Sequence, residues 1–243
     1  MLKLIRIEFL KLRHKRLIWV MLLAALVMPL ISWGYFRNSF ATDITPIAFY
    51  KWSMLGYTSW VILPVVLGVL CTLLMYDEKI NDVLKQLWIV PVSRIGYFLG
   101  KFSVVLIYSV IFVTVDAGAS VLIGVGSGTI PFTWDSVRYL LLKSLEIGIL
   151  MSFGVLPILA VAAAQKGYIM PVCVTLVYTF AGFILLMINM YLCPLSAVTA
   201  IVIVDIPGTS PDTVINIPAA SSCIGVWAIG SVLYGCKALR KGV

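Results

Sequence analysis

Six runs of apolar residues, each about as long as a bilayer is thick, constrain this chain more than any other feature. A helix needs roughly 20 consecutive apolar residues to cross the hydrocarbon core of a bilayer. Because lipid offers no hydrogen bonds to the backbone, each run is expected to be a helix, whose peptide groups bond within the segment. The expected spans are residues 17–36, 55–76, 102–125, 139–164, 168–190 and 221–239.

The composition also indicates that the chain is surrounded by lipid. Apolar residues make up 62% of the 243 residues and charged residues only 12%, whereas an ordinary soluble domain carries roughly 25% charged residues. Such a chain cannot cover a soluble surface with polar groups, so lipid must surround most of it. The whole chain, residues 1–243, is therefore expected to form a single all-α transmembrane domain with six spans.

The net charge of +8 follows from where the lysines and arginines lie. Cytoplasmic segments of membrane proteins carry an excess of these residues. If the N-terminus is cytoplasmic, fourteen of the eighteen basic residues fall in cytoplasmic segments, and the others are Arg37, Lys51, Arg138 and Lys143. The sequence thus predicts a multi-pass protein of the cell membrane with both termini in the cytoplasm, and it gives no reason to expect nucleic-acid binding.

Residues that could support catalysis or hold a metal are sparse. The nearest approach to a phosphate-binding loop has three residues between Gly96 and Gly100 where the motif needs four, and Phe102 replaces the hydroxyl residue that would hold magnesium. The only histidine is His14, and the five cysteines form no CxxC pair, so no metal site is expected. A Ser-Lys dyad remains open. No catalytic residue and no cofactor are predicted, and ATP with its magnesium would bind to another polypeptide.

The N-terminal stretch MLKLIRIEFLKLRHKR is amphipathic. Its apolar residues recur three or four positions apart, at Leu2, Ile5, Phe9 and Leu12, and basic residues lie between them. A helix of this kind lies in the interfacial plane, with its cations near anionic headgroups. The alternative is a basic tail that only sets the topology, and both descriptions can hold together.

The connection between the second and third spans reads DEKINDVLKQLWIVPVSRIGYFLGK. Its large apolar residues fall on one face of a short helix, and they are Val83, Leu84, Leu87 and Trp88. Pro91 then ends the pattern. An amphipathic helix with such a face is suited to dock in a groove on a partner protein. The alternative is that it lies on the membrane surface and anchors the loop.

The connection from 191 to 220 is too apolar for an ordinary external loop. Its residues 197–204, AVTAIVIV, are too few to span the bilayer, with Pro194 before them and Asp205 after them. A short re-entrant or interfacial element is expected here, because backbone exposed to lipid must be satisfied locally. A short extracellular strand pair is the alternative.

Together, these features resemble the type-2 permeases of ABC exporters. The resemblance rests on the Glu-containing basic pre-helix IEFLKLRHKR, the six spans and the acidic Leu-Lys-Gln-Leu…Pro-Val-Ser-Arg…Gly-Lys connection, and it covers essentially the whole chain. It implies that the first cytoplasmic loop is a coupling helix that sits on the ATPase subunit, here with Asp82, Val83, Leu84, Leu87, Trp88 and Arg94. It also implies an in-plane connecting helix at the N-terminus, here with Arg6, Glu8, Phe9 and Arg13. In length, the chain is similar to the small permeases of lantibiotic-immunity and bacitracin-resistance exporters.

Two ionisable residues lie within expected spans, Asp116 in the third and Glu146 in the fourth. Each costs roughly 2.5–3.5 kcal/mol at mid-membrane on insertion scales, so each should face protein or water. Either residue would suit the lining of a translocation route. The alternative is a local bond, for example from Lys143 to Glu146.

The sequence therefore predicts the permease subunit of a bacterial ABC exporter. Its expected partners are cytoplasmic ATPase subunits, a second permease copy or paralogue, membrane lipid and an amphipathic antimicrobial peptide as substrate. One rival is a self-sufficient secondary transporter or channel, coupled through Asp116 or Glu146, and a second rival is an intramembrane enzyme.

Overall fold

The computed structural model describes residues 8–12, 15–38, 45–80, 93–165, 167–206 and 215–241. These residues form helices and no strands, and six of the helices are long and apolar enough to cross a membrane. The all-α fold with six spans is thereby confirmed. The N-terminal segment, described over residues 8–12, is helical as well.

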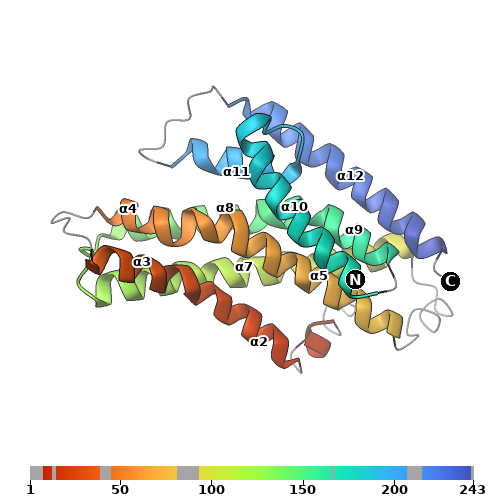
Figure 1. Ribbon diagram of the computed structural model, residues 1–243, viewed down its shortest axis with the longest axis horizontal. Helices are drawn as coiled ribbons and strands as arrows, with labels where there is room; N and C mark the ends of the chain where they lie inside the picture. Colours follow the sequence, from red (N-terminus) through yellow and green to blue (C-terminus); the bar gives the residue numbers. More distant parts are fainter. Residues whose placement is uncertain are drawn as a thin grey trace.

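The six spans are continuous helical paths (Figure 1), and the first two change helix type along their length. The first comprises α2 (Arg16–Leu23), η1 (Ala24–Leu26) and α3 (Val27–Asn38); the second comprises α4 (Pro46–Tyr50), η2 (Lys51–Leu55), η3 (Thr58–Ile62) and α5 (Leu63–Ile80). The third is α7 (Arg94–Gly126), the fourth comprises α8 (Trp134–Gly154) and α9 (Leu156–Ala164), the fifth is α10 (Ile169–Ile188) and the sixth is α12 (Ile217–Lys241).

The second and third spans begin well before the predicted positions of 55 and 102, and in both cases a helix cap explains the difference. The Thr45 hydroxyl accepts a hydrogen bond from the Ala48 amide at 3.4 Å and is followed by Pro46, the residue that best tolerates the first helical position. Ser93 caps α7 in the same way, through the Gly96 amide at 3.1 Å. Capping side chains satisfy the free amides of a first turn, so these helices extend beyond their apolar runs.

The first half of the second span is wound as two π-helical segments, η2 and η3, separated at Gly56. A Cβ atom at Gly56 would lie 2.7 Å from the Lys51 carbonyl oxygen, so only glycine fits this break. π-Helical turns are rare and are frequently found at functional sites. The second span is therefore irregular from Lys51 to Ile62 and regular over α5.

The centre of the bundle is formed by α5, α7 and the α8–α9 pair, while α2–α3, α10 and α12 lie around them (Figure 1). Close approaches at glycine hold neighbouring helices together, such as Gly68 of α5 against Thr175 of α10. The outer helices expose large apolar side chains, including Leu23, Val177 and Leu233, as lipid contact requires.

Between the fifth and sixth spans lies α11 (Pro194–Val204). Its 11 residues are too few to span the bilayer, and most of them are buried against α8, α10 and α12. This agrees with the short re-entrant element expected at 197–204, and no strand occurs in the described part of this connection. The helix begins three residues earlier than expected, because Pro194 occupies its first turn.

Candidate functional site

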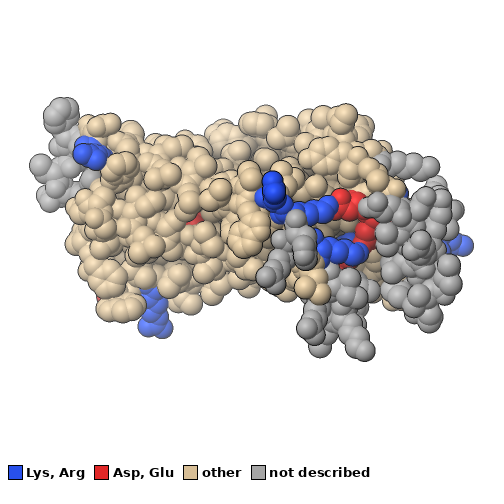
Figure 2. All heavy atoms as spheres, turned by 90° about the horizontal axis from the view of Figure 1, so that it is seen from below, with Lys and Arg blue, Asp and Glu red and all other residues tan. Residues whose placement is uncertain are grey.

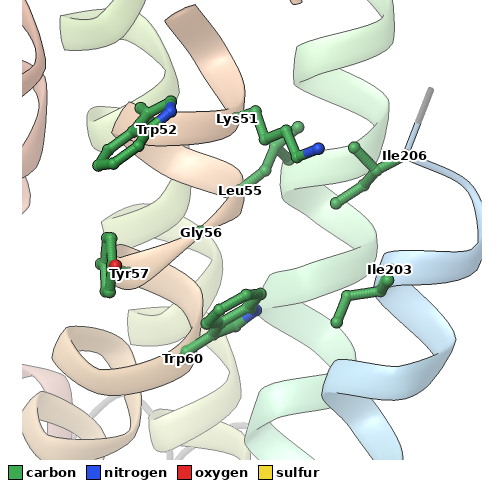
Figure 3. Close-up of a pocket in the computed structure, with 8 residues that line it drawn as sticks. All are labelled: Lys51, Trp52, Leu55, Gly56, Tyr57, Trp60, Ile203 and Ile206. Atoms are coloured by element: carbon green, nitrogen blue, oxygen red, sulfur yellow. The ribbon is translucent and has the colours of Figure 1, made fainter. Parts of the chain in front are cut away.

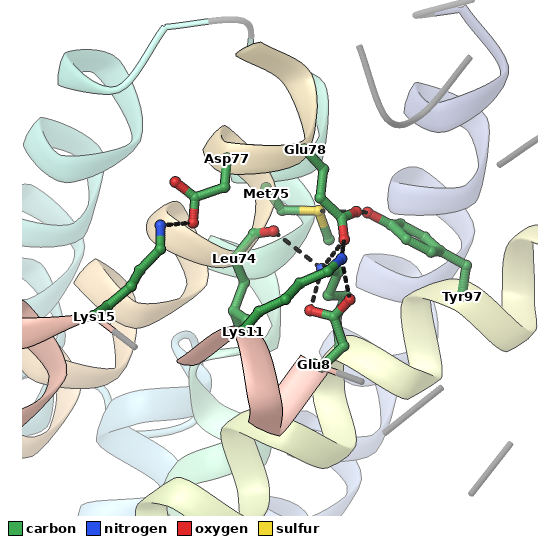
Figure 4. Close-up of polar contacts among 9 residues, drawn as sticks. Glu8, Lys11, Lys15, Leu74, Met75, Asp77, Glu78 and Tyr97 are labelled. Carbon is green, nitrogen blue, oxygen red and sulfur yellow. Dashed lines mark hydrogen bonds and ion pairs between the residues drawn. The ribbon is translucent and has the colours of Figure 1, made fainter. Parts of the chain in front are cut away.

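Three parts of the chain meet at the end of the bundle that carries the start of the first span. They are the helical segment 8–12, the last turn of α5 and the first two turns of α7 (Figure 4). The meeting point is defined by a cluster of polar residues, Glu8, Lys11, Glu78, Tyr97 and Lys101, which is called the Glu8–Lys101 cluster below.

Lys101 is the centre of this cluster and is completely buried. Its ammonium group donates to Glu8 Oε2 at 2.6 Å, to Glu78 Oε1 at 2.7 Å and to the Leu74 carbonyl oxygen at 3.1 Å. A lysine ammonium has three hydrogens to donate, so every one of them is used.

The two carboxylates of the cluster are equally well satisfied. Glu78 Oε1 also accepts from Lys11 at 2.8 Å, and its Oε2 accepts from the Tyr97 hydroxyl. Glu8 Oε1 accepts from Lys11 at 3.1 Å. Two carboxylates thus face two ammonium groups, the buried one of Lys101 and the half-exposed one of Lys11, so that the charges of the cluster cancel. A buried network in which every group is satisfied is rigid and fixes a single arrangement of its parts.

Lys11 and Lys15 form the outer edge of this region. Burial alone would lower the pKa of Lys11, but hydrogen bonding and Coulomb attraction from Glu78 and Glu8 outweigh it and hold that pKa above its ordinary value. Lys15 pairs with Asp77. On the face seen in Figure 2, most Lys, Arg, Asp and Glu side chains gather toward the two ends of the molecule and very few lie in the broad middle, as expected for a membrane protein.

One further lysine ties the end of α5 to another span. The Lys79 ammonium group donates to the carbonyl oxygens of Ala162 and Ala163 at 3.1 and 2.7 Å, and also to that of Gln165. These carbonyls lie at the carboxyl end of α9, where a helix leaves acceptors unsatisfied and favours a cation. Side chains of consecutive residues in α5, Asp77 to Lys79, therefore hold the first, third and fourth spans at this end.

The cluster brings together only some of the residues predicted for coupling and for the interfacial helix. Glu8 belongs to it, and Phe9 packs against the apolar core beside it. Arg94 is the first residue of α7, one turn before Tyr97. Arg6, Arg13 and the predicted coupling helix with Asp82, Val83, Leu84, Leu87 and Trp88 lie outside the described residues.

Sequence reasoning missed Glu78, Tyr97 and Lys101 as site residues. It counted Lys101 as a topology-setting charge at the mouth of the third span, yet this residue is buried within α7. The signal that could have found it is the four-residue spacing of Tyr97 and Lys101, which puts both side chains on one helix face.

The two acidic residues predicted within spans differ in their surroundings. The Glu146 side chain is 37% exposed and pairs with the buried Lys143 at 2.8 Å, and Lys143 also pairs with Asp205 at the end of α11 at 2.9 Å. Asp116 is fully buried, and its carboxyl oxygens have no hydrogen-bond partner among the described residues. The structure therefore does not join Asp116 to Glu146, and Glu146 makes the local bond that was the alternative to a route-lining role.

A cavity of about 210 Å³ lies between the irregular part of the second span and the end of α11 (Figure 3). Its walls combine one cation, three aromatic rings, a glycine and three aliphatic side chains, contributed by Lys51, Trp52, Leu55, Gly56, Tyr57, Trp60, Ile203 and Ile206. The rings continue as a row, with Tyr35 stacked on Trp52 at 5.2 Å and Trp60 beside Phe183 at 6.2 Å between ring centroids. An apolar, aromatic cavity of this kind suits the apolar part of an amphipathic molecule.

The fold and this charge distribution define a multi-pass membrane protein in which the Glu8–Lys101 cluster joins helices at one end and the Lys143–Asp205 pair joins α8 to the end of α11. Residues 4–182, about three quarters of the chain, match the family described as ABC-2 family transporter protein. The chain belongs to this family, as the sequence resemblance predicted, and is an ABC transporter permease. Among individually curated proteins, none matches the sequence. Proteins of the family are membrane subunits that associate in general with ABC ATPase subunits.

Proposed function

We propose that this chain is the permease subunit of an ATP-driven exporter in a bacterial cell membrane, with both termini in the cytoplasm. It would pair with a second permease copy or paralogue and with cytoplasmic ATPase subunits that bind ATP and magnesium. The observation that carries the proposal is the Glu8–Lys101 cluster, because it joins both ends of the 81–92 segment to the N-terminal segment.

The cluster suggests how ATPase movement would reach the spans. α5 ends at Ile80 and α7 begins at Arg94, so a push on the predicted helix with Leu84 and Trp88 would act on both ends of the segment at once. Glu78 and Lys101 bind these two spans together at 2.7 Å. The second and third spans would therefore tilt as one unit and carry the N-terminal segment with them.

The proposed substrate is an amphipathic antimicrobial peptide, of lantibiotic or bacteriocin type, expelled for immunity or resistance. The support is the resemblance to small permeases of such exporters. The cavity beside Trp52 and Trp60 adds to it, because aromatic and aliphatic walls with Lys51 nearby match an amphipathic ligand. A molecule already dissolved in the membrane could enter such a cavity from the lipid.

The test is copurification of the chain with ABC ATPase subunits from the cells that produce it. Leu84→Asp combined with Trp88→Ala removes two anchors of the predicted docking face, and a central Trp in an interface typically contributes above 2 kcal/mol. The double variant is expected to insert and fold but to retain no ATPase, whereas Lys85→Ala, on the polar face, should retain it. If the double variant binds the ATPase as tightly as the wild type, this coupling assignment is wrong. If no ATPase copurifies with the wild type and transport proceeds without ATP, the exporter proposal fails.

A further inference from the structure

Four buried side-chain polar atoms of the described residues have no hydrogen-bond partner. They are both carboxyl oxygens of Asp116, the hydroxyl of Ser120 and the indole nitrogen of Trp60. Asp116 and Ser120 are four residues apart on α7, so their side chains share one helix face. Because buried polar groups are almost always satisfied, the three oxygen atoms on this face call for a physical explanation.

The contrast with other hydroxyls on α7 makes Ser120 unusual. Ser103 donates to the Leu99 carbonyl at 2.9 Å, and Thr114 donates to the Val110 carbonyl at 2.7 Å. Both bonds return to the residue's own helix, as is usual for Ser and Thr within a span. Ser120 makes no such bond, so its hydroxyl hydrogen remains available on the face that carries Asp116.

Thr58 of the π-helical segment η3 is a polar neighbour of the Asp116 carboxyl group, and no hydrogen bond joins the two side chains in the described structure. Its hydroxyl hydrogen is committed elsewhere, because Thr58 donates to the Ser53 carbonyl at 2.8 Å. The hydroxyl oxygen therefore has only lone pairs to offer to Asp116. Two oxygen atoms with facing lone pairs repel each other unless a positive charge or a hydrogen lies between them.

No cation supplies that charge within the described part of the chain. The ion pairs there involve Glu8, Asp77, Glu78, Glu146 and Asp205, and none involves Asp116. Asp116 is 0% exposed. An isolated ionised carboxylate is far more costly to bury than a neutral, hydrogen-bonded group. One hydrogen on the carboxyl group removes both the net charge and the lone-pair repulsion.

We propose that Asp116 is an intramembrane proton-binding site, in which the un-ionised carboxyl group donates its hydrogen to the Thr58 hydroxyl oxygen and accepts one from Ser120. The bound proton links α7 to the irregular half of the second span without placing a charge in the membrane. The site thus holds the second span next to its break at Gly56, where a pivot of α5 would be centred. It requires a proton as ligand instead of a metal ion.

Infrared difference spectroscopy of the purified full-length chain in lipid nanodiscs tests the protonation state directly. The wild type is expected to show the carbonyl stretching band of an un-ionised carboxylic acid at neutral pH, and Asp116→Asn should lose it. A spectrum in which Asp116→Asn removes only a carboxylate band overturns the proposal.

Thermal unfolding supplies the second readout. In Asp116→Asn the amide can still donate to Thr58 and accept from Ser120, so the unfolding midpoint should stay within about 2 °C of the wild type. Thr58→Val should lower the midpoint by more than that shift, and Thr58→Ser should restore it. A midpoint that falls strongly in Asp116→Asn contradicts the neutral site. The salt dependence of the midpoint tests for a metal ion. If sodium chloride raises the midpoint of the wild type but choline chloride does not, and Asp116→Asn shows no such rise, the site binds a metal ion and the proposal is also overturned.

Discussion

The ammonium group of Lys101 lies 2.6 Å from a carboxylate oxygen of Glu8, although 93 residues separate the two in the chain. Both side chains are almost completely enclosed. The contact joins a segment that precedes the first span to the third span, so it determines where the N-terminal segment lies relative to the bundle.

Lys101→Met is expected to destabilise the protein by about 3–5 kcal/mol, because it leaves two buried carboxylates short of their main partner. The measurement is reversible denaturation of the purified protein in detergent. Lys15→Met is the matched control: its partner Asp77 and Lys15 itself are both about one-third exposed, and such pairs contribute about 0–1 kcal/mol. If the two variants lose equal amounts of unfolding free energy, burial of the Glu8–Lys101 cluster adds nothing to its contribution to stability.

Glu8→Gln should loosen the N-terminal segment while leaving the spans intact. The amide keeps the shape of the side chain but removes the charge that both Lys11 and Lys101 contact. Amide hydrogen exchange of a peptide covering residues 8–12 is expected to become faster. The control is Thr114→Val, which removes an exposed hydroxyl that bonds only its own helix. Unchanged protection in Glu8→Gln would mean that apolar packing of the segment is sufficient to hold it.

Gly68→Ala should be destabilising by about 1–3 kcal/mol through overpacking. A Cβ atom at this position would lie 2.2 Å from a side-chain carbon of Thr175, and so would push α5 away from α10. Gly118→Ala meets nothing within 4 Å and should be neutral or slightly stabilising, because alanine favours a helix over glycine. The measurement is the unfolding midpoint of each variant. An unchanged midpoint in Gly68→Ala would contradict the close approach of α5 and α10.

Glu146→Gln is expected to reduce stability by less than about 1 kcal/mol, because Lys143 keeps its contact with Asp205 at 2.9 Å. Transport should be preserved if the residue only makes this local bond. Lys143→Met is the matched comparison. It leaves both Glu146 and Asp205 without their cation and should reduce stability more than Glu146→Gln does. If Glu146→Gln is stable and correctly assembled but does not transport, Glu146 lines the translocation route.

The proposed topology can be measured by cysteine labelling of intact cells. A reagent that cannot cross the membrane should modify a cysteine placed at Thr209 but not one placed at Lys85 or Lys241, because the Lys and Arg asymmetry favours a cytoplasmic location for the latter two. Labelling at Lys85 from outside would reverse the orientation and remove the argument for a coupling helix.

The six spans could be predicted from the sequence because lipid imposes one strong rule, the length of an apolar helix. Helix ends and charged contacts follow weaker and more distant determinants. Thr45 and Ser93 lengthen their helices through single capping bonds, which a search for apolar runs does not detect. The pairing of Lys101 with Glu8 could not be predicted, since nothing local in either stretch specifies its partner. The alternative bond of Glu146 to Lys143 was predictable because it lies within one turn.

The order of synthesis gives the Lys101 contact a consequence for biogenesis. Glu8 and Glu78 leave the ribosome before Lys101 does, so Lys11 is the one lysine of the cluster that can pair with them until the third span has been made. The N-terminal segment therefore lacks its buried contact with the third span while only two spans are in the membrane, and in a chain arrested before residue 101 its amides should exchange faster than in the complete chain. Maturation of this end of the protein is thus timed by its third span, well after its first residues have emerged.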